Sequence, residues 1–403
     1  MPPPEREVNC GRLKLELLCR GLRVECELGE HRPILRTRAG LGSGLELVLG
    51  KDVWVNVPVD EEFARRSPYA LKSDCRPVHS SDSIPRPSPT LLLWRNADPL
   101  ARVRLAPRPR FYDRATSTGV PMNRIGVLQG RTLAVYPTRV CEFWKRGQNC
   151  RFCATGLNVG VNEESEKGVG DVEEVACAAR AEGITFAHFN TGYYGGGELD
   201  VLEPYVRAAK RAGMLVGVQC PPQQDLKAYD RLKAAGADHF SFCFEFFNPR
   251  VFAELCPGKA ETLGREAFFR AMEYASRLMG KGRVSGEIIA GLEPIEDTLR
   301  AIEFIASVGA FPTICIFRPL RGTALEDRAP PDPGEMARVF EHCYRAMSRR
   351  RIPTGIAPGV NTSLIILPSE CRYFARPALA YEIELLALRA VYRSYYWLKS
   401  RKP

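Results

Sequence analysis

Three cysteines that lie close together are the residues of this chain best suited to chemistry. Cys141, Cys150 and Cys153 are spaced C-x8-C-x2-C in the stretch CEFWKRGQNCRFC, directly after a short apolar run. Thiolates are soft ligands that suit iron–sulfur clusters and zinc. Structural zinc sites and ferredoxin-type clusters normally have four protein ligands. Three local cysteines with no obvious fourth therefore predict a cluster with one open metal position.

A glycine-rich turn, TGYYGGGE at 191–198, is the second signal. Consecutive glycines allow a backbone to approach a ligand closely, and a carboxylate beside them can bind an ammonium group. Glu245 ends a later apolar run and suits a ligand's hydroxyl groups; it also suits a carboxylate at the start of a helix. Both positions predict ligand contacts at the ends of strands.

The elements that position these residues follow a strand–helix alternation from about residue 130. The expected strands are largely apolar, as in parallel sheets covered on both faces; they are 132–136, 184–189, 215–219, 239–246, 283–289 and 313–317. The expected helices are 172–181, 201–212, 226–235, 265–278, 295–307 and 334–349. Six such units predict an α/β fold with a partial or complete βα barrel of the TIM type, whose chemistry lies at the carboxyl ends of the strands.

The rest of the chain predicts two additions to this core. Residues 1–120 carry short strand candidates at 22–28, 45–49, 53–57, 91–94 and 103–105, which predict a β-rich accessory domain. A Ser/Pro-rich stretch at 72–90 is expected to be an exposed loop. The barrel core is expected at 121–350, and 351–403 forms an extension whose final helix, about 378–398, suits packing or a homodimer contact.

The order of these motifs resembles that of the radical S-adenosylmethionine (SAM) enzymes, although their usual cysteine spacing is C-x3-C-x2-C. The resemblance implies that Cys141, Cys150 and Cys153 bind three irons of a [4Fe-4S] cluster, and that the fourth iron chelates SAM. One electron would then cleave SAM to a 5'-deoxyadenosyl radical. Phe152 would face the adenine, and Gly196, Gly197 and Glu198 would hold the amino group of SAM.

Two later segments, GEIIAGLE at 286–293 and FRPLRGTALED at 317–327, resemble the biotin synthase-related branch. The implied SAM-binding residues there are Ser285, Glu287, Ile289, Gly291 and Arg318, with Glu245 at the ribose. Candidate substrate contacts are His188, Asn190 and Gln219. Sulfur insertion of the biotin or lipoyl type is an alternative. Its auxiliary cluster would need Cys220, the one matching ligand position, or a different set made of Cys220, Cys243 and Cys315.

Composition leaves one non-enzyme alternative open. The 403 residues carry a net charge of +10, which suits a nucleic-acid partner. The arginines are dispersed, however, which favours a solvated surface over a zinc-stabilised RNA-binding protein. No apolar run approaches ~20 residues and the start does not resemble a signal peptide, so we expect a cytoplasmic protein with mostly reduced cysteines. The expected partners are a small-molecule substrate and an electron donor such as flavodoxin or ferredoxin.

Overall fold

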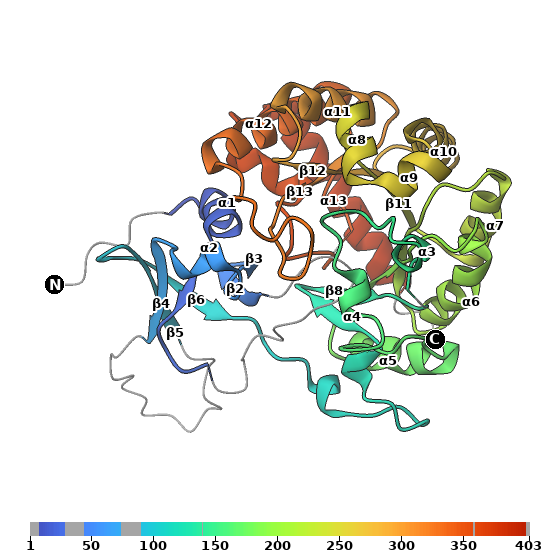
Figure 1. Cartoon of the computed structure of the whole chain (residues 1–403), viewed down its shortest axis with the longest axis horizontal. Helices are drawn as coiled ribbons and strands as arrows, with labels where there is room; N and C mark the ends of the chain where they lie inside the picture. Colours follow the sequence, from blue (N-terminus) through green and yellow to red (C-terminus); the bar gives the residue numbers. More distant parts are fainter. Residues whose placement is uncertain (1–7, 29–43, 74–89, 139, 358, 400–403) are drawn as a thin grey trace.

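The protein is described by a computed structural model that covers residues 8–28, 44–73, 90–138, 140–357 and 359–399 (Figure 1). These residues form two sheets, one of six strands near the amino terminus and one of seven strands in the rest of the chain. Most of the Ser/Pro-rich loop lies outside the described residues. Among those described, no helix is both long and apolar enough to cross a membrane.

The amino-terminal sheet has the strand order β1-β4-β5-β6-β2-β3. Its strands are β1 (Arg23–Val24), β2 (Leu45–Leu49), β3 (Val53–Val57), β4 (Tyr69–Ser73), β5 (Thr90–Arg95) and β6 (Asp98–Leu105). All neighbours are antiparallel except β1 and β4. Leu47 and Val55 are fully buried, the helix α1 (Cys10–Arg20) packs against β3, and the short helix α2 (Glu62–Arg65) follows β3. A β-rich sheet in this region is confirmed.

Helix α1 was not predicted, and its sequence explains why. Arg12, Lys14 and Glu16 alternate with leucines, a period of two that is typical of strands. The helix forms because Asn9 caps it through a hydrogen bond from the Arg12 N–H (3.0 Å), and because most of its residues are buried. Even Lys14 is fully buried, so tertiary contacts outweigh the local pattern.

The second sheet has the order β13-β12-β11-β10-β9-β8-β7. Its strands are β7 (Val127–Gln129), β8 (Thr132–Val135), β9 (Phe186–Asn190), β10 (Leu215–Gln219), β11 (His239–Glu245), β12 (Val284–Ala290) and β13 (Phe311–Ile316). The six strands β8–β13 are parallel, as predicted, while the unpredicted β7 pairs antiparallel with β8. Because β7 and β13 are the two ends of the sheet, the barrel is partial rather than complete.

Helices between the strands cover the outer face of this sheet (Figure 1). They are α5 (Val169–Ala181), α6 (Glu198–Arg211), α7 (Lys227–Ala235), α10 (Arg265–Met279), α11 (Ile295–Ser307) and α12 (Pro333–Arg350). Each lies close to a predicted helix. The short helices α8 (Pro249–Leu255) and α9 (Pro257–Thr262) were missed, because a proline opens each one and neither is long enough to establish an apolar period.

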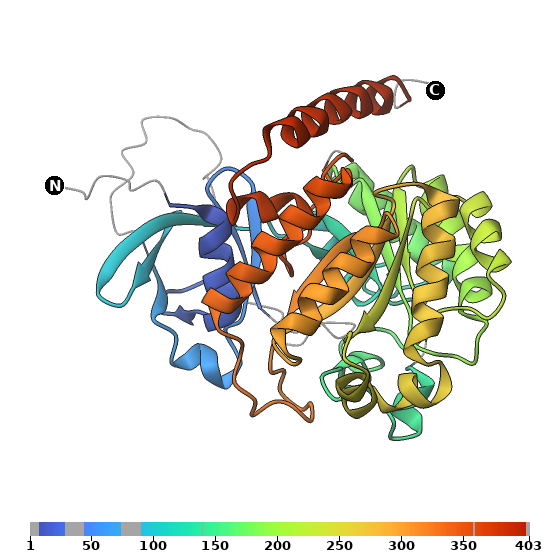
Figure 2. The ribbon, with the colours of Figure 1, turned by 90° about the horizontal axis from the view of Figure 1, so that it is seen from above.

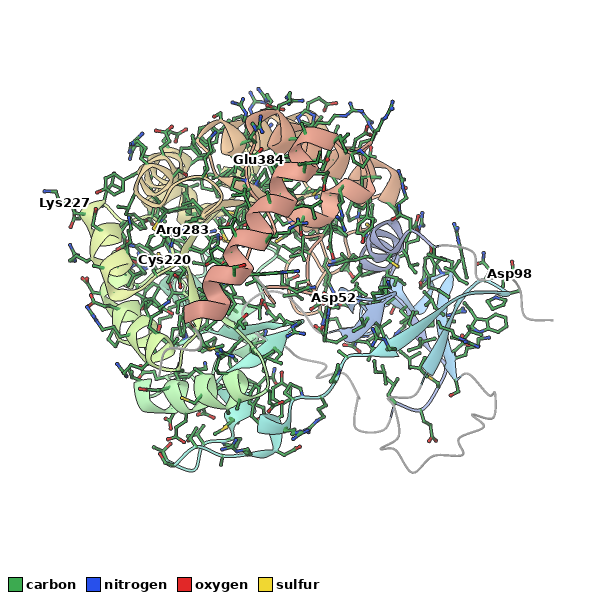
Figure 3. All side chains as sticks on the ribbon, turned by 180° about the vertical axis from the view of Figure 1, so that it is seen from behind. Asp52, Asp98, Cys220, Lys227, Arg283 and Glu384 are labelled. Carbon is green, nitrogen blue, oxygen red and sulfur yellow. The ribbon has the colours of Figure 1, made fainter. Side chains whose placement is uncertain are left out.

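The two sheets lie side by side, and buried polar contacts join them. Asp98 on the amino-terminal sheet and Lys227 on the barrel lie at opposite ends of the molecule (Figure 3). Lys14 of α1 forms an ion pair of 2.8 Å with Glu370 in η4 (Pro368–Tyr373), which follows the barrel. The last helix, α13 (Leu379–Lys399), lies beyond α12 at the outside of the molecule (Figure 2).

We expect Lys14→Met to lower the free energy of unfolding by about 3 kcal/mol, because it leaves the Glu370 carboxylate buried without its cation. Urea unfolding followed by circular dichroism measures this loss. Lys51→Met, at an exposed turn position, is the matched control and should change stability by less than about 0.5 kcal/mol. Equal stability of the two variants would contradict a structural role for this ion pair.

Candidate active site at the carboxyl ends of the barrel strands

The cysteine loop leaves the carboxyl end of β8, as predicted, and lies against the loop that follows β9. The Glu142 N–H, at the start of the short helix α3 (Glu142–Lys145), donates to the Tyr193 carbonyl at 2.9 Å. The Phe143 and Tyr193 rings stack at 4.7 Å. A Cβ on Gly192 would collide with Cys141, so only glycine permits this approach. The two predicted motifs are therefore neighbours in space.

The segment after β11 holds the other end of the cysteine loop. The Arg151 N–H donates to the Leu255 carbonyl at 2.9 Å, and the Gly258 N–H donates to the Gln148 carbonyl at 3.1 Å. A Cβ on Gly258 would lie 2.5 Å from the Phe143 ring, so this contact also requires glycine. The loops after β8, β9 and β11 thus meet at one edge of the sheet.

Hydrogen-bond donors surround the sulfur atoms of the three cysteines. The Tyr193 N–H donates to Cys141 Sγ at 3.3 Å, and the Thr155 N–H, in the short helix α4 (Thr155–Asn158), donates to Cys153 Sγ at 3.4 Å. Burial raises the pKa of Cys141 and of Cys153, and a negative charge on Cys150 raises both further. Cys141 and Cys153 therefore each lie within electrostatic range of Cys150.

A fourth cysteine, Cys256, lies beside this group and was not predicted to belong to it. Its fully buried thiol hydrogen-bonds with Cys150, and this bond lowers the pKa of Cys150 against the effect of burial. Cys256 lies more than a hundred residues beyond the cysteine loop, so no local spacing connects them. Only the packing of the Leu255–Gly258 segment on that loop brings them together.

The sulfur donors of the cysteine loop are soft ligands, which suit iron–sulfur clusters and zinc. Within the described residues, no group of three or more His, Cys, Asp or Glu side chains is placed to hold one metal ion. Zinc needs four ligands that converge on one point. A four-iron cluster distributes its cysteine ligands over separate irons, so they need not converge. Three nearby sulfurs with N–H donors beside them fit that requirement.

The glycine turn presents its backbone, not its carboxylate, to the surroundings. Gly195, Gly196 and Gly197 are exposed, and a Cβ on any of them would meet nothing within 4 Å. Glu198, at the start of α6, is fully buried and accepts from the Tyr194 N–H at 2.6 Å and from Gln223 at 2.8 Å. The carboxylate thus stabilises the turn, and the role predicted for Glu198 in holding the amino group of SAM stays a prediction.

Glu245 ends β11 in a strained conformation next to a buried cation. Its φ is +66°, which is unusual for a residue with a side chain, and the register with β12 shifts at this point. Its carboxylate accepts from Lys259 at 2.6 Å, and Lys259 also donates to the Cys243 carbonyl at 2.8 Å. Burial opposes the charge on Lys259, but Glu245 and the nearby cysteines raise its pKa well above the usual range.

The remaining predicted cofactor residues lie in three different surroundings. Phe152 packs edge-on against Phe246 at 5.9 Å, near the cysteines. Ile289 is 8% exposed, and a Cβ on Gly291 would lie 2.6 Å from Pro331, so both have packing roles. Arg318 donates to Glu61 at 2.6 Å and to Asn56 at 3.1 Å. Its guanidinium thus joins the barrel to the amino-terminal sheet, and the contact predicted for Arg318 with SAM stays a prediction.

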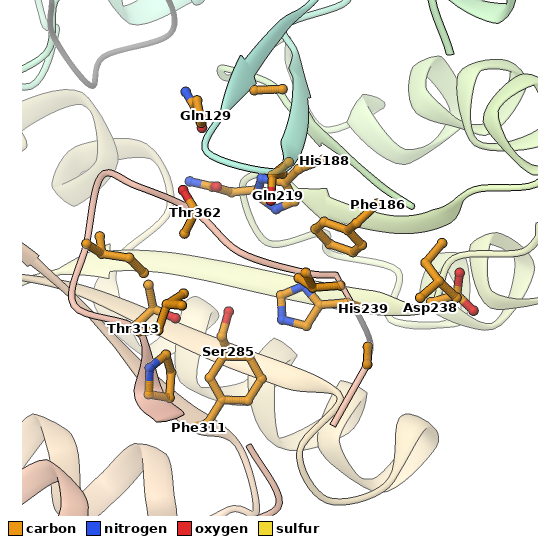
Figure 4. A pocket seen from close by; sticks show the side chains of 18 of the residues that line it. Gln129, Phe186, His188, Gln219, Asp238, His239, Ser285, Phe311, Thr313 and Thr362 are labelled. Carbon is orange, nitrogen blue, oxygen red and sulfur yellow. The ribbon is translucent and has the colours of Figure 1, made fainter. Parts of the chain in front are cut away.

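A cavity of about 470 Å³ lies inside the partial barrel and brings other predicted residues together (Figure 4). His188, Asn190 and Gln219, the predicted substrate contacts, all line it, as do Ser285 and Glu287, which were predicted to bind SAM. Burial raises the pKa of Glu287, which accepts hydrogen bonds from Ser241 and from Cys243. Residues 353–357, together with Leu388 and Tyr392 of α13, also line the cavity.

The cavity also contains a histidine that the sequence pattern did not single out. His239 is the first residue of β11, and its ring lies 6.3 Å from that of His188. Burial lowers the pKa of His188 to about 4 and that of His239 to about 3, so both rings are neutral at neutral pH. Cys315 lines the same cavity, but Cys220 is not among the residues that line it.

Comparison with known proteins finds partial similarity to several enzymes. No protein-family model matches the chain. The chain is 28% identical over 221 residues to bacteriochlorophyllide c C-7(1)-hydroxylase of Chlorobaculum limnaeum, covering 48% of this chain and 54% of that enzyme. It thus spans about half the length of the curated relative that it matches. This similarity to an enzyme supports the prediction of catalysis.

Solved structures show likeness over about half of the chain, with low TM-scores. Methylornithine synthase matches with a TM-score of 0.44 and 16% identity, covering 53% of this chain and 62% of that one. The FeFe-hydrogenase maturase HydG from Carboxydothermus hydrogenoformans matches at 0.42 and 17%, covering 54% and 51%. SuiB from Streptococcus suis matches at 0.43 and 12%, covering 55% and 47%.

We expect Lys259→Met to lower the free energy of unfolding by about 3 kcal/mol, because it leaves the buried Glu245 carboxylate without its cation. Chemical denaturation measures the change, and Lys227→Met, at an exposed helix position, is the control. The double variant Lys259→Met/Glu245→Gln should recover part of the lost free energy of unfolding, because it also removes the unpaired carboxylate charge. A double variant as unstable as the single one would contradict this account.

Stability should fall on mild acidification because of the buried histidines. The unfolded chain binds a proton at His188 near pH 6.5, whereas the folded chain resists it down to about pH 4. Unfolding is therefore favoured as the pH falls through this window. Between pH 7 and pH 5.5, the free energy of unfolding should fall by about 1 kcal/mol less in His188→Phe than in the wild type. Urea titrations at both values measure it, and identical losses would contradict the depressed pKa.

Proposed function

We propose that this protein is a radical SAM enzyme that abstracts hydrogen from a C–H bond of a small organic substrate. The observation that carries the proposal is the meeting of the loops after β8, β9 and β11 at the carboxyl edge of the sheet, where the loop with Cys141, Cys150 and Cys153 is held by backbone hydrogen bonds. When bound, a [4Fe-4S] cluster with SAM supplies one-electron cleavage to methionine and a 5'-deoxyadenosyl radical. A donor of the flavodoxin or ferredoxin type supplies the electron.

The chain's own residues hold and shield these groups. Cys141, Cys150 and Cys153 bind the cluster, and the backbone of Gly196 and Gly197 lies open beside them for SAM. Glu245 takes the ribose hydroxyl groups, with Lys259 fixing the position of its carboxylate. Phe152 supplies an apolar surface for the adenine. The positive charge of Lys259 also favours the thiolate forms that a cluster requires, because opposite charges stabilise each other in a low-dielectric site.

The interior cavity supports the proposal that a small organic substrate binds inside the barrel. It extends to Asn190 and Gln219, the last residues of β9 and β10, and thus reaches the edge where the cysteine loop lies. The relative named above is a hydroxylase of a bacteriochlorophyllide. We infer that the present protein also acts on an unactivated carbon position, and that the cavity keeps the radical away from water and from other C–H bonds.

Sulfur insertion is the second candidate, and one observation bears on it. An auxiliary cluster made of Cys220, Cys243 and Cys315 would need these thiols to face one space. Cys315 lines the cavity, whereas Cys220 is not among its lining residues, and Cys243 is engaged by Gln219 and Glu287. Hydrogen abstraction without an auxiliary cluster is therefore the function that we favour. Iron content near four per chain supports it, and clearly more supports the second candidate.

The proposal is tested by anaerobic reconstitution with iron and sulfide, reduction with dithionite and addition of SAM. We expect a brown protein that forms 5'-deoxyadenosine, detected by liquid chromatography, and a reduced-cluster signal in electron paramagnetic resonance that changes when SAM is added. Cys150→Ala should lose the cluster and the product. Cys177→Ala, at an exposed helix position, is the control and should retain both.

Cys256→Ser separates the three-ligand assignment from a four-ligand one. Because Cys256 hydrogen-bonds with Cys150 but is not one of the three proposed ligands, this variant should retain about four irons and form 5'-deoxyadenosine. Loss of the cluster in Cys256→Ser, together with a wild type that does not cleave SAM, would identify a closed four-cysteine site and overturn the proposed radical chemistry. A colourless protein loaded with zinc would favour the RNA-binding alternative.

A further inference from the structure

Four rings form a continuous row across the inner wall of the barrel, at the end opposite the cysteine loop. Phe186 and His188 of β9 stack at 6.0 Å with an interplanar angle of 19°. The His188 and His239 rings follow at 6.3 Å, and His239 stacks on Phe311 of β13 at 5.5 Å and 17°. The row is visible along the cavity in Figure 4. Phe186, His239 and Phe311 are the first residues of their strands.

Gly217 of β10 makes this row possible. It pairs with His188 on one side and with His239 on the other. A Cβ at this position would lie 2.6 Å from the Phe186 ring, 2.7 Å from the His188 ring and 3.3 Å from His239 Nδ1. Any larger residue would therefore push the rings apart, whereas glycine lets them close over the strand. The arrangement of the four rings thus depends on glycine at position 217.

The His239 ring is incomplete without a further partner. Both of its nitrogens are buried, and neither makes a hydrogen bond with any described residue. A buried polar atom without a partner costs about 1–3 kcal/mol, so such atoms in native structures normally have a role. The ring is neutral at physiological pH, so one nitrogen can donate a hydrogen bond and the other can accept one. Turning toward a molecule in the cavity would satisfy it.

Most of the charged side chains that line the cavity contact other groups of the protein, although one carboxylate oxygen of Glu163 has no partner among the described residues. Arg124 is paired with Glu164, Glu163 with Lys167, and Arg283 with Asp238. The ammonium of Lys281 donates to the Arg350 carbonyl, and the Glu287 carboxyl accepts from Ser241 and Cys243. The four rings of the row carry no charge at neutral pH, so a charged ligand lying against them would lose hydration without gaining an ion pair from the row, which is unfavourable.

We propose that this cavity binds the substrate as an uncharged molecule whose flat conjugated ring lies along the row of Phe186, His188, His239 and Phe311, with one polar atom hydrogen-bonded to the His239 imidazole. The inference rests on the function proposed above and names the substrate class of the same enzyme. His239 becomes a specificity-determining residue, because a hydrogen-bonding site discriminates against molecules that lack the matching group. Residues 353–357 and α13 cover the bound molecule.

The test uses three probes that share one ring system and differ in charge: 1-naphthol, 1-naphthoate and 1-(aminomethyl)naphthalene. Each is titrated into the reconstituted holoprotein at pH 7.5 by isothermal calorimetry. We expect 1-naphthol to bind at least about tenfold more tightly than either charged probe, and His239→Phe to weaken its binding about tenfold while keeping the ring row. His342→Phe, on α12 outside the cavity, is the matched control and should bind as the wild type does.

A second measurement decides the matter even if His239→Phe does not fold. The chain has five histidines, so selective ¹⁵N-histidine labelling gives few signals, and that of His239 should shift when 1-naphthol binds to the wild type. Equal affinity for all three probes, no binding of 1-naphthol, or no shift of the His239 nitrogens would overturn the inference. Binding of 1-naphthol by a reconstituted wild type that does not cleave SAM would keep the ligand site while removing the radical SAM proposal.

Discussion

The parallel sheet imposes the constraint on which the rest of the structure depends. Because β8 to β13 run in one direction, every loop that leaves a carboxyl end arrives at the same edge, and loops remote in sequence must share that space. They do so through backbone contacts that tolerate no side chain, at Gly192 against Cys141 and at Gly258 against Phe143. The sulfur-rich loop is therefore positioned by its neighbours rather than by its own sequence.

Charge is distributed unequally along the barrel axis, and this follows from the same geometry. Glu245 and Lys259 form a buried ion pair where β11 ends, next to the cysteines. Toward the opposite end of the strands two buried rings are neutral, because burial keeps His188 and His239 unprotonated at neutral pH. A charged group is stabilised where it has a partner and is excluded where it has none. The two ends of the barrel thus suit different ligands, an ionic one near the sulfurs and an uncharged one deeper inside.

The sequence predicted those parts of the fold that depend on local pattern. The six parallel strands are short apolar runs between helices, so the sequence pattern predicted them. The place of the cysteine loop could be predicted because it directly follows the first of these strands. Contacts between residues far apart in the sequence could not be predicted from the local pattern. Arg318 pairs with Glu61, Cys256 lies beside Cys150, and the alternating residues of α1 conceal a helix that tertiary packing stabilises. His239 was missed because a polar residue opening a strand looks like a boundary, although here it faces the cavity.

The partial barrel explains how one small domain combines a reactive edge with a selective interior. An open sheet leaves its two edge strands unpaired on one side, and in this chain residues 353–357 and two residues of α13 contribute to the cavity lining beside the strands. Part of the cavity lining therefore comes from segments that follow the strand–helix units. The sequence of these segments can change without altering the cysteine loop. Strand β10 contributes to both regions. Its Gln219 lies near the carboxyl edge of the sheet, and its Gly217 leaves the space in which the four rings meet. Selectivity and reactivity are then set by different residues on shared strands, which is the arrangement expected where one chemistry is applied to a particular substrate.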